Sequence, residues 1–138
     1  MRLQSVLRKT IIFITHDFDE AIRLADRIAI MKDGEIIQSG TPEELVLRPA
    51  TDYVAEFTRD VQRAKVMSAR RLMQPLSTAH PDDKKIAADA KISSFAADIV
   101  SARKAFVVVD ERGSPIGEVT HQAVIDLLAA GEPAEARR

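Results

Sequence analysis

The sequence predicts an α/β fold in two parts, and three patterns carry that prediction. An apolar run at residues 11–14 leads directly into a helix-start signal at Asp17. Two short β-type runs then meet at an Asp-Gly pair, which is a strong signal for a two-residue hairpin. Over residues 93–131, a helix, a strand, a turn, a strand and a helix follow one another, which indicates an α+β unit at the C-terminal end.

The first elements are a helix, a strand and a second helix. Residues 2–8 have apolar side chains at helical spacing. The apolar run at 11–14 predicts a strand that is buried on both faces between parallel neighbours. Residues 18–25 should form a helix with Asp17 as its N-cap, and Glu20 should complete a capping box.

A hairpin and two short helices follow. The runs at 27–31 and 35–38 are joined by Lys-Asp-Gly and predict two antiparallel strands. A Thr cap, with Pro at the first helical position and Glu at the third, predicts a helix through Leu47. Asp52 should cap the next short helix. We expect residues 1–62 to form one segment.

Residues 63–84 are predicted to be a linker, because they alternate basic and small residues and contain Pro75 and Pro81. A second unit should occupy residues 85–131, and 132–138 should be a tail. The elements expected in this unit are a short strand at 85–88, a helix capped by Ser93, strands at 106–109 and 115–119, and a helix from His121 that Gly131 stops.

Composition excludes several classes of function. The 138 residues contain 20 basic and 21 acidic side chains, so a nucleic-acid partner is not expected. There is no cysteine, and the three histidines are scattered, so no metal site is predicted. No signal peptide and no apolar run of about 20 residues is present. We expect a cytoplasmic protein whose partners are proteins.

The strand-end motif Thr-His-Asp around His16 begins the stretch THDFDEAIRLADRIAIMKDGEIIQSGTPEEL. This stretch closely resembles the histidine-switch segment of ABC-transporter ATPases, and within them the ATP-binding subunits of glycine betaine/proline betaine importers. The resemblance implies that residues 1–62 are the C-terminal remnant of an ABC ATPase domain. It also implies that His16 contacts the γ-phosphate of ATP in a complete subunit that uses ATP and Mg²⁺, a role suited to an imidazole.

The rest of an ATPase site does not occur in the sequence. None of the five glycines is followed by Lys-Ser or Lys-Thr, so there is no phosphate-binding GxxxxGK[ST] loop, and no Ser-Gly-Gly-Gln signature is present. Residues 107–111, Val-Val-Val-Asp-Glu, match a Walker B strand in composition but lie far downstream of His16 and lead into a tight turn. We therefore expect this chain alone to bind no cofactor and to be inactive as an ATPase.

The second unit contains FVVVDERGSPIGEVTHQAVIDLLAAG, which resembles the second half of a CBS motif. In nucleotide-binding members a Thr or Ser and an Asp hold phosphate and ribose. Thr120 matches the hydroxyl position, whereas Ala123 stands where the carboxylate is expected. Capping of the last helix is the simpler role for Thr120. Because CBS motifs usually work in pairs, the resemblance implies a homodimer with a second ATP-binding subunit through this region.

Taken together, these patterns predict the ATP-binding, energy-coupling subunit of an osmoprotectant importer, present here as a C-terminal segment with a CBS regulatory region. Its other partner would be the membrane permease, which places the assembled subunit at the inner face of the cell membrane. Two alternatives remain open: a free-standing CBS-type regulatory or dimerisation module, and a truncated gene product without a role. An in-frame upstream continuation that carries the phosphate loop would decide for the first hypothesis.

Overall fold

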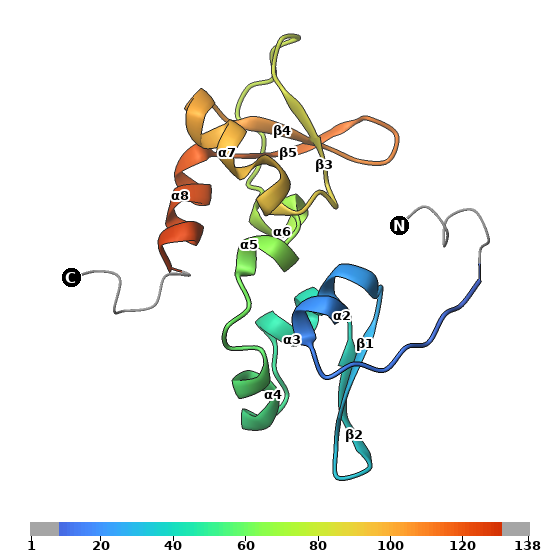
Figure 1. Ribbon diagram of the computed structural model, residues 1–138. Helices are drawn as coiled ribbons and strands as arrows, with labels where there is room; N and C mark the ends of the chain where they lie inside the picture. The colour runs from blue at the N-terminus through green and yellow to red at the C-terminus, as the bar shows by residue number, and fades with distance from the viewer. Residues whose placement is uncertain (1–8, 131–138) are drawn as a thin grey trace. The chain divides into compact units, whose positions relative to one another are not determined.

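The computed structural model describes residues 9–130, and the chain divides into two compact units, residues 1–61 and 62–138 (Figure 1). Each unit has its own small sheet, a two-stranded one in the first and a three-stranded one in the second. The helix predicted at residues 2–8 and the stop predicted at Gly131 lie outside the described residues.

The strand predicted at residues 11–14 is wrong for this structure. Residues 9–15 contain no helix or strand, and the side chains of Ile12 and Ile14 are 89% and 98% exposed. A strand forms only when its backbone groups pair with a neighbouring strand. Among residues 9–130, no segment provides that neighbour for residues 11–14.

Helix α2, Phe18–Leu24, starts where the sequence predicted. The Asp17 side chain is its N-cap and accepts a hydrogen bond from the Glu20 backbone N–H at 3.1 Å. The capping box predicted here is wrong, because the Glu20 carboxylate accepts from the Thr15 hydroxyl at 2.7 Å. The Asp17 backbone N–H donates to the same hydroxyl at 3.0 Å, so Thr15 takes the place of the Glu20 side chain.

Strands β1, Ile28–Lys32, and β2, Glu35–Gly40, form the predicted antiparallel hairpin. Asp33 and Gly34 both have positive φ, at 52° and 80°, as a two-residue type I′ turn requires. A register shift between Ile30 and Met31 adds one residue to β2. The hairpin places Ile28 and Ile30 on its buried face.

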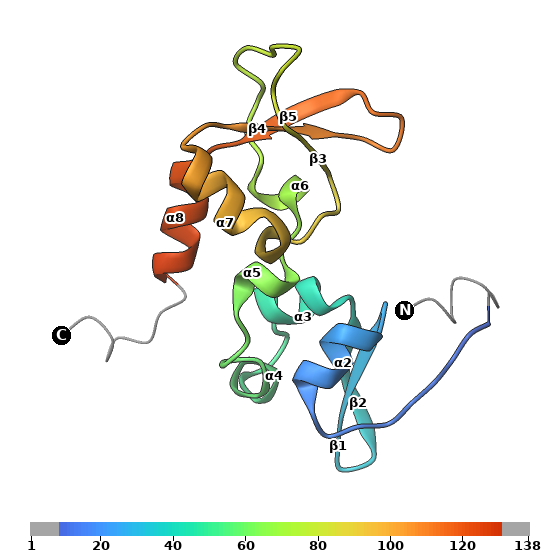
Figure 2. The ribbon, with the colours of Figure 1, turned by 45° about the horizontal axis from the view of Figure 1, so that its top comes forward.

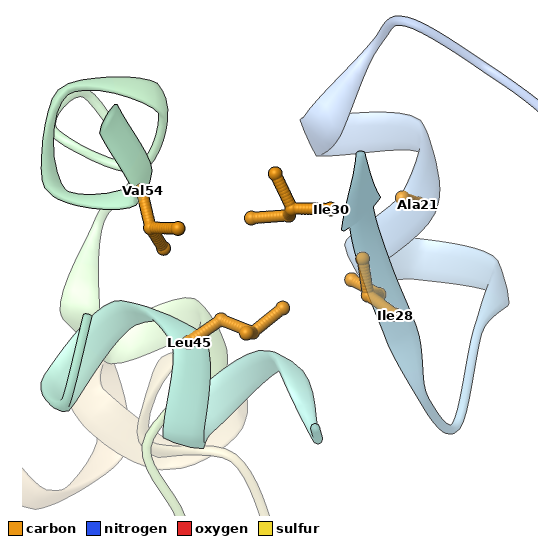
Figure 3. Packing of buried hydrophobic residues seen from close by; sticks show 5 residues of the cluster. All are labelled: Ala21, Ile28, Ile30, Leu45 and Val54. Carbon is orange, nitrogen blue, oxygen red and sulfur yellow. The ribbon is translucent and has the colours of Figure 1, made fainter. Parts of the chain in front are cut away.

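Two short helices complete the first unit. Helix α3, Pro42–Leu47, has a full capping box between Thr41 and Glu44, as predicted. Helix α4, Asp52–Phe57, is capped by Thr51, so the prediction of Asp52 as the cap is wrong by one residue. The five buried side chains that form the core of this unit come from α2, β1, α3 and α4, and they are Ala21, Ile28, Ile30, Leu45 and Val54 (Figure 3).

In the second unit, the first part of the predicted linker is folded. Helices α5, Arg63–Val66, and α6, Ala69–Leu72, begin the unit. The helices and the short connection between them bury four apolar side chains, those of Ala64, Val66, Met67 and Ala69. Helix α5 packs against the two longer helices of the unit. The basic residues between the buried positions point to solvent, which explains why the composition suggested a linker.

The rest of the unit follows the predicted order. Strands β3, Lys85–Ala87, β4, Phe106–Val109, and β5, Pro115–Val119, form a sheet in the order β3-β4-β5, with β3 parallel and β5 antiparallel to β4. Helix α7, Ile92–Ala102, connects β3 to β4, and α8, His121–Ala130, follows β5. The N-cap of α7 is Lys91 without a side-chain bond, so the prediction of Ser93 as the cap is wrong.

The two faces of this sheet are covered differently. Phe106 lies 6.5 Å, ring centre to ring centre, from Phe95 of α7, so one face packs against helices. Val107 and Glu118 are paired across β4 and β5 and share the opposite face, where both are buried. Residues 73–84, which we call the strap, leave α6, pair with β5 at Gln74 and then cross to β3 (Figure 2). The strap contains no helix or strand.

No helix in residues 9–130 is long and apolar enough to cross a membrane.

Candidate functional site

His16 lies just before α2, between residues 9–15, which form no helix or strand, and the N-cap residue Asp17. Its side chain is exposed and lines an open hollow of about 430 Å³ in the first unit. Phe18 and Phe57, whose rings meet edge to face with centres 5.4 Å apart, form the apolar wall. Carboxylates from Asp17, Asp19 and Asp60 also line the hollow.

The backbone on both sides of His16 is held by local hydrogen bonds. The Thr15 hydroxyl donates to Glu20 and accepts from the Asp17 N–H, while Asp17 caps the helix that follows. These bonds fix the backbone position from which the His16 side chain extends. None of them involves a ring nitrogen of the imidazole. A histidine presented in this way can donate a hydrogen bond to a phosphate oxygen that approaches the hollow.

Thr120, the predicted nucleotide contact of the second unit, caps helix α8. Its hydroxyl accepts from the Ala123 backbone N–H at 3.2 Å. Three residues upstream, a Cβ atom added at Gly117 would lie 2.8 Å from the Gln74 carbonyl oxygen and 2.9 Å from the Met73 sulfur. The chain therefore packs closely against this side of the motif that carries Thr120.

The Walker B-like residues 107–111 form a strand and a turn. Strand β4 ends at Val109, and the Asp110 side chain accepts from the backbone N–H groups of Arg112 and Ser114, both at 2.9 Å. Gly113 completes the turn with a φ of 79°. The Asp110 carboxylate is an acceptor within the turn, as the sequence analysis expected of this segment.

Sequence reasoning missed a second hollow, which lies in the second unit and has a volume of about 640 Å³. The end of the strap, the C-terminal half of α7 and the start of β4 form it. Lys84 bridges it, because its ammonium group is 3.0 Å from Asp98 and 5.1 Å from the ring centre of Phe106. No local sequence pattern brings these three residues together.

The buried Glu118 was also missed. Its carboxylate accepts from the Ser77 hydroxyl at 3.0 and 3.2 Å and from the Gln74 side-chain amide at 3.2 Å. The backbones of Gln74 and Glu118 also exchange hydrogen bonds at 2.9 and 3.0 Å. A Glu within an otherwise apolar strand was the available signal, because such a residue needs donors when it is buried.

Comparison with known proteins gives a consistent assignment. The chain is 46% identical over 132 residues to the trimethylamine N-oxide transport system ATP-binding protein of Pelagibacter ubique, a match that covers 96% of this chain and 39% of that protein. It is 42% identical over 128 residues to the protein of the same description from Ruegeria pomeroyi, covering 93% of this chain and 37% of the relative. The chain thus spans about two fifths of the length of these relatives.

Other relatives match about half of the chain. The glycine betaine transport ATP-binding protein of Bacillus subtilis is 53% identical over 74 residues, which are 54% of this chain and 18% of that protein. A solved CBS domain of a bacterial CNNM/CorC family Mg²⁺ transporter aligns with 84% of this chain and 62% of that chain, at 16% identity and a TM-score of 0.32. No protein-family model matches the chain. The sequence matches identify the chain as the C-terminal region of an ATP-binding subunit of the quaternary-amine ABC transporter family.

Proposed function

We propose that this chain is the part of a quaternary-amine importer's ATP-binding subunit that supplies the histidine switch and a CBS-type regulatory unit. The observation that carries the proposal is the match along 96% of the chain to an ATP-binding protein of a trimethylamine N-oxide transport system. The complete subunit would use ATP and Mg²⁺, and the present chain would not be catalytic alone, since it has no phosphate-binding loop. The solute is a quaternary or tertiary amine derivative, with glycine betaine or proline betaine as our specific proposal.

His16 is the proposed contact to the γ-phosphate. The exposed imidazole at the edge of a hollow, on backbone fixed by Thr15 and Asp17, supports this role. A positioned donor acts on charge that develops in the transition state, so its loss should reduce turnover much more than nucleotide binding.

The test replaces His16 by Ala in a complete subunit that includes this segment. We expect ATP hydrolysis to fall by about 100-fold or more, with the Kd for ATP changed by less than about threefold. The matched control is His80→Ala, because His80 is an exposed histidine of the second unit. A His16→Ala subunit that hydrolyses ATP at the parental rate would refute the assignment.

The proposed partners are the permease and a second ATP-binding subunit, with the assembly at the inner face of the cell membrane. We propose that the second units of two subunits pair. Ile125 and Leu128 support this pairing, because they are exposed on one side of α8 at a spacing of three residues. Thr120 remains the proposed nucleotide contact, and it would have to give up its capping bond to Ala123 in order to bind.

Leu128→Asp tests the pairing. A charge placed in a paired surface should abolish association, whereas at a 42% exposed position it should leave the monomer folded. Ala130→Asp is the control on a different side of the same helix. Sedimentation of both variants decides the question, and unchanged association of Leu128→Asp would exclude this surface as the interface.

A further inference from the structure

The strap has a defined course across the second unit. It begins at the outer edge of β5, where Gln74 pairs with Glu118, and ends at Lys84, directly before β3. Because β4 lies between these two strands, the strap must pass from one edge of the sheet to the other. Ser77 bonds to the Glu118 side chain, so the start of the strap lies on the face of the sheet that carries Val107 and Glu118.

The attachment of the strap is mostly polar and lies at its two ends. At the far end the Lys84 carbonyl accepts from the Val107 backbone N–H at 2.9 Å, and the Lys84 ammonium group is 3.0 Å from Asp98. Residues 77–82 are exposed, so the middle of the strap buries little apolar surface. At its start, the Glu118 carboxylate is buried and receives bonds from Ser77 and Gln74. Bonds to a charged, buried acceptor are stronger than bonds between neutral groups, whereas the Lys84–Asp98 pair at the other end is exposed. The Glu118 cluster is therefore the stronger of the two attachments.

The other face of the sheet is held in a different way. Helices α7 and α8 pack against each other and against α5, and their side chains Ile92, Ile99 and Val124 are fully buried. Regions with few apolar contacts open locally at lower free energy than packed cores. The two faces of one small sheet therefore differ in how easily they can be uncovered.

We propose that the strap is a closure held by the Glu118 carboxylate, which opens as one element while the helix-covered face stays packed. In the open state Val107 and the outer edge of β5 become accessible. The closed state is tightly fitted, since a Cβ atom at Gly117 would come within 2.8 Å of the Gln74 carbonyl oxygen. The second unit thus has a surface that is available only in the open state.

Adjacent valines provide the test. Val107 and Val108 are both buried, at 3% and 0% exposure, but lie on opposite faces of the sheet. The chain contains no cysteine, so Val107→Cys and Val108→Cys each introduce a single thiol whose labelling rate reports exposure of one face. We expect the thiol at position 107 to react at least about tenfold faster than the thiol at 108 in the full chain.

Ser77→Ala removes one donor from the carboxylate. It should accelerate labelling at position 107 by about 10- to 100-fold and leave labelling at position 108 unchanged. Ser77→Thr, which keeps the hydroxyl, should restore the parental rate. Ser94→Ala is the matched control, because the Ser94 hydroxyl bonds only to the Lys91 carbonyl among the described groups.

Gly117→Ala provides an independent way to open the strap, because the new methyl group must displace Gln74 or Met73. It should also accelerate labelling at position 107 selectively. Equal labelling of the two thiols, or equal acceleration of both by Ser77→Ala, would show that the unit opens as a whole and would overturn the proposal. Unchanged labelling at position 107 in Ser77→Ala would equally refute the role of the carboxylate.

Discussion

The two units of this chain differ in how many large apolar side chains they leave exposed to solvent. In the first unit eight large apolar side chains are exposed among the described residues: Ile11, Ile12, Phe13, Ile14, Met31, Ile36, Tyr53 and Phe57. In the second unit only Ile125 and Leu128 are exposed in the part that the structure describes. The second unit encloses its apolar faces with α5 and α7, whereas the first leaves an apolar segment without any cover.

This difference separates a unit that completes its own core from one that is shaped to pack on further protein. A contiguous exposed apolar segment such as residues 11–14 marks a contact surface. The relatives, which are more than twice as long as the matched region, offer the kind of chain that would cover it. The comparison therefore predicts that substitutions of buried residues lower the stability of the second unit, and that substitutions at residues 11–14 lower association through the first.

The largest effect is expected from Ile99→Ala in the second unit. Ile99 is fully buried between the helices, and its truncation should lower the free energy of unfolding of this unit by about 2–5 kcal/mol. Ile125→Ala on α8 is the matched control and should cost less than about 1 kcal/mol, because this side chain is 37% exposed and Ala favours helix.

Native-state amide exchange at Val108, in the central strand β4, measures both variants. Equal losses for Ile99→Ala and Ile125→Ala would mean that α8 is covered in solution, by a second copy or by other protein. In that case the pairing proposed for α8 would contribute to the stability of the second unit, and the contrast between a self-contained second unit and an incomplete first unit would be lost.

A smaller effect on stability, but a clear one on association, is expected in the first unit. The double substitution Ile12→Lys and Ile14→Lys should change the free energy of unfolding by less than about 0.5 kcal/mol, because neither side chain packs on the chain. Self-association of the chain should decrease in light scattering. A loss of stability would show instead that residues 11–14 contribute to the fold of the first unit.

The elements that the sequence predicted well are those whose cause is local. The hairpin follows from Asp33-Gly34, which provides two positive φ values, and α3 follows from the Thr41–Glu44 capping box. The order of strands and helices after Lys85 was also predicted, because local signals such as the turn between Asp110 and Gly113 and the Thr120 cap separate β4, β5 and α8. The strand predicted at residues 11–14 did not form, because a strand needs a neighbouring strand and local sequence does not show whether one is present.

Tertiary contacts explain the other differences. The residues around α5 and α6 look like a linker in composition. Only the packing of α5 against α7 and α8, and of α6 against β5, shows that Val66 and Ala69 are core residues. For the candidate site, the sequence predicted the location of His16 before a capped helix, whereas the hollow around it requires Phe57 and Asp60 from α4 and beyond. Its catalytic role stays a prediction.

The buried carboxylate of Glu118 also has an evolutionary consequence. Its donors are 41 and 44 positions away in the sequence, at Ser77 and Gln74, so three distant sites share one constraint. In an ancestor or descendant with Val or Ile at position 118, the side chains at positions 74 and 77 would be free to change. A return to Glu at position 118 would be tolerated only after a hydroxyl or amide donor had reappeared at position 74 or 77. Substitutions at these three positions should therefore be historically contingent, accepted in some orders and rejected in others.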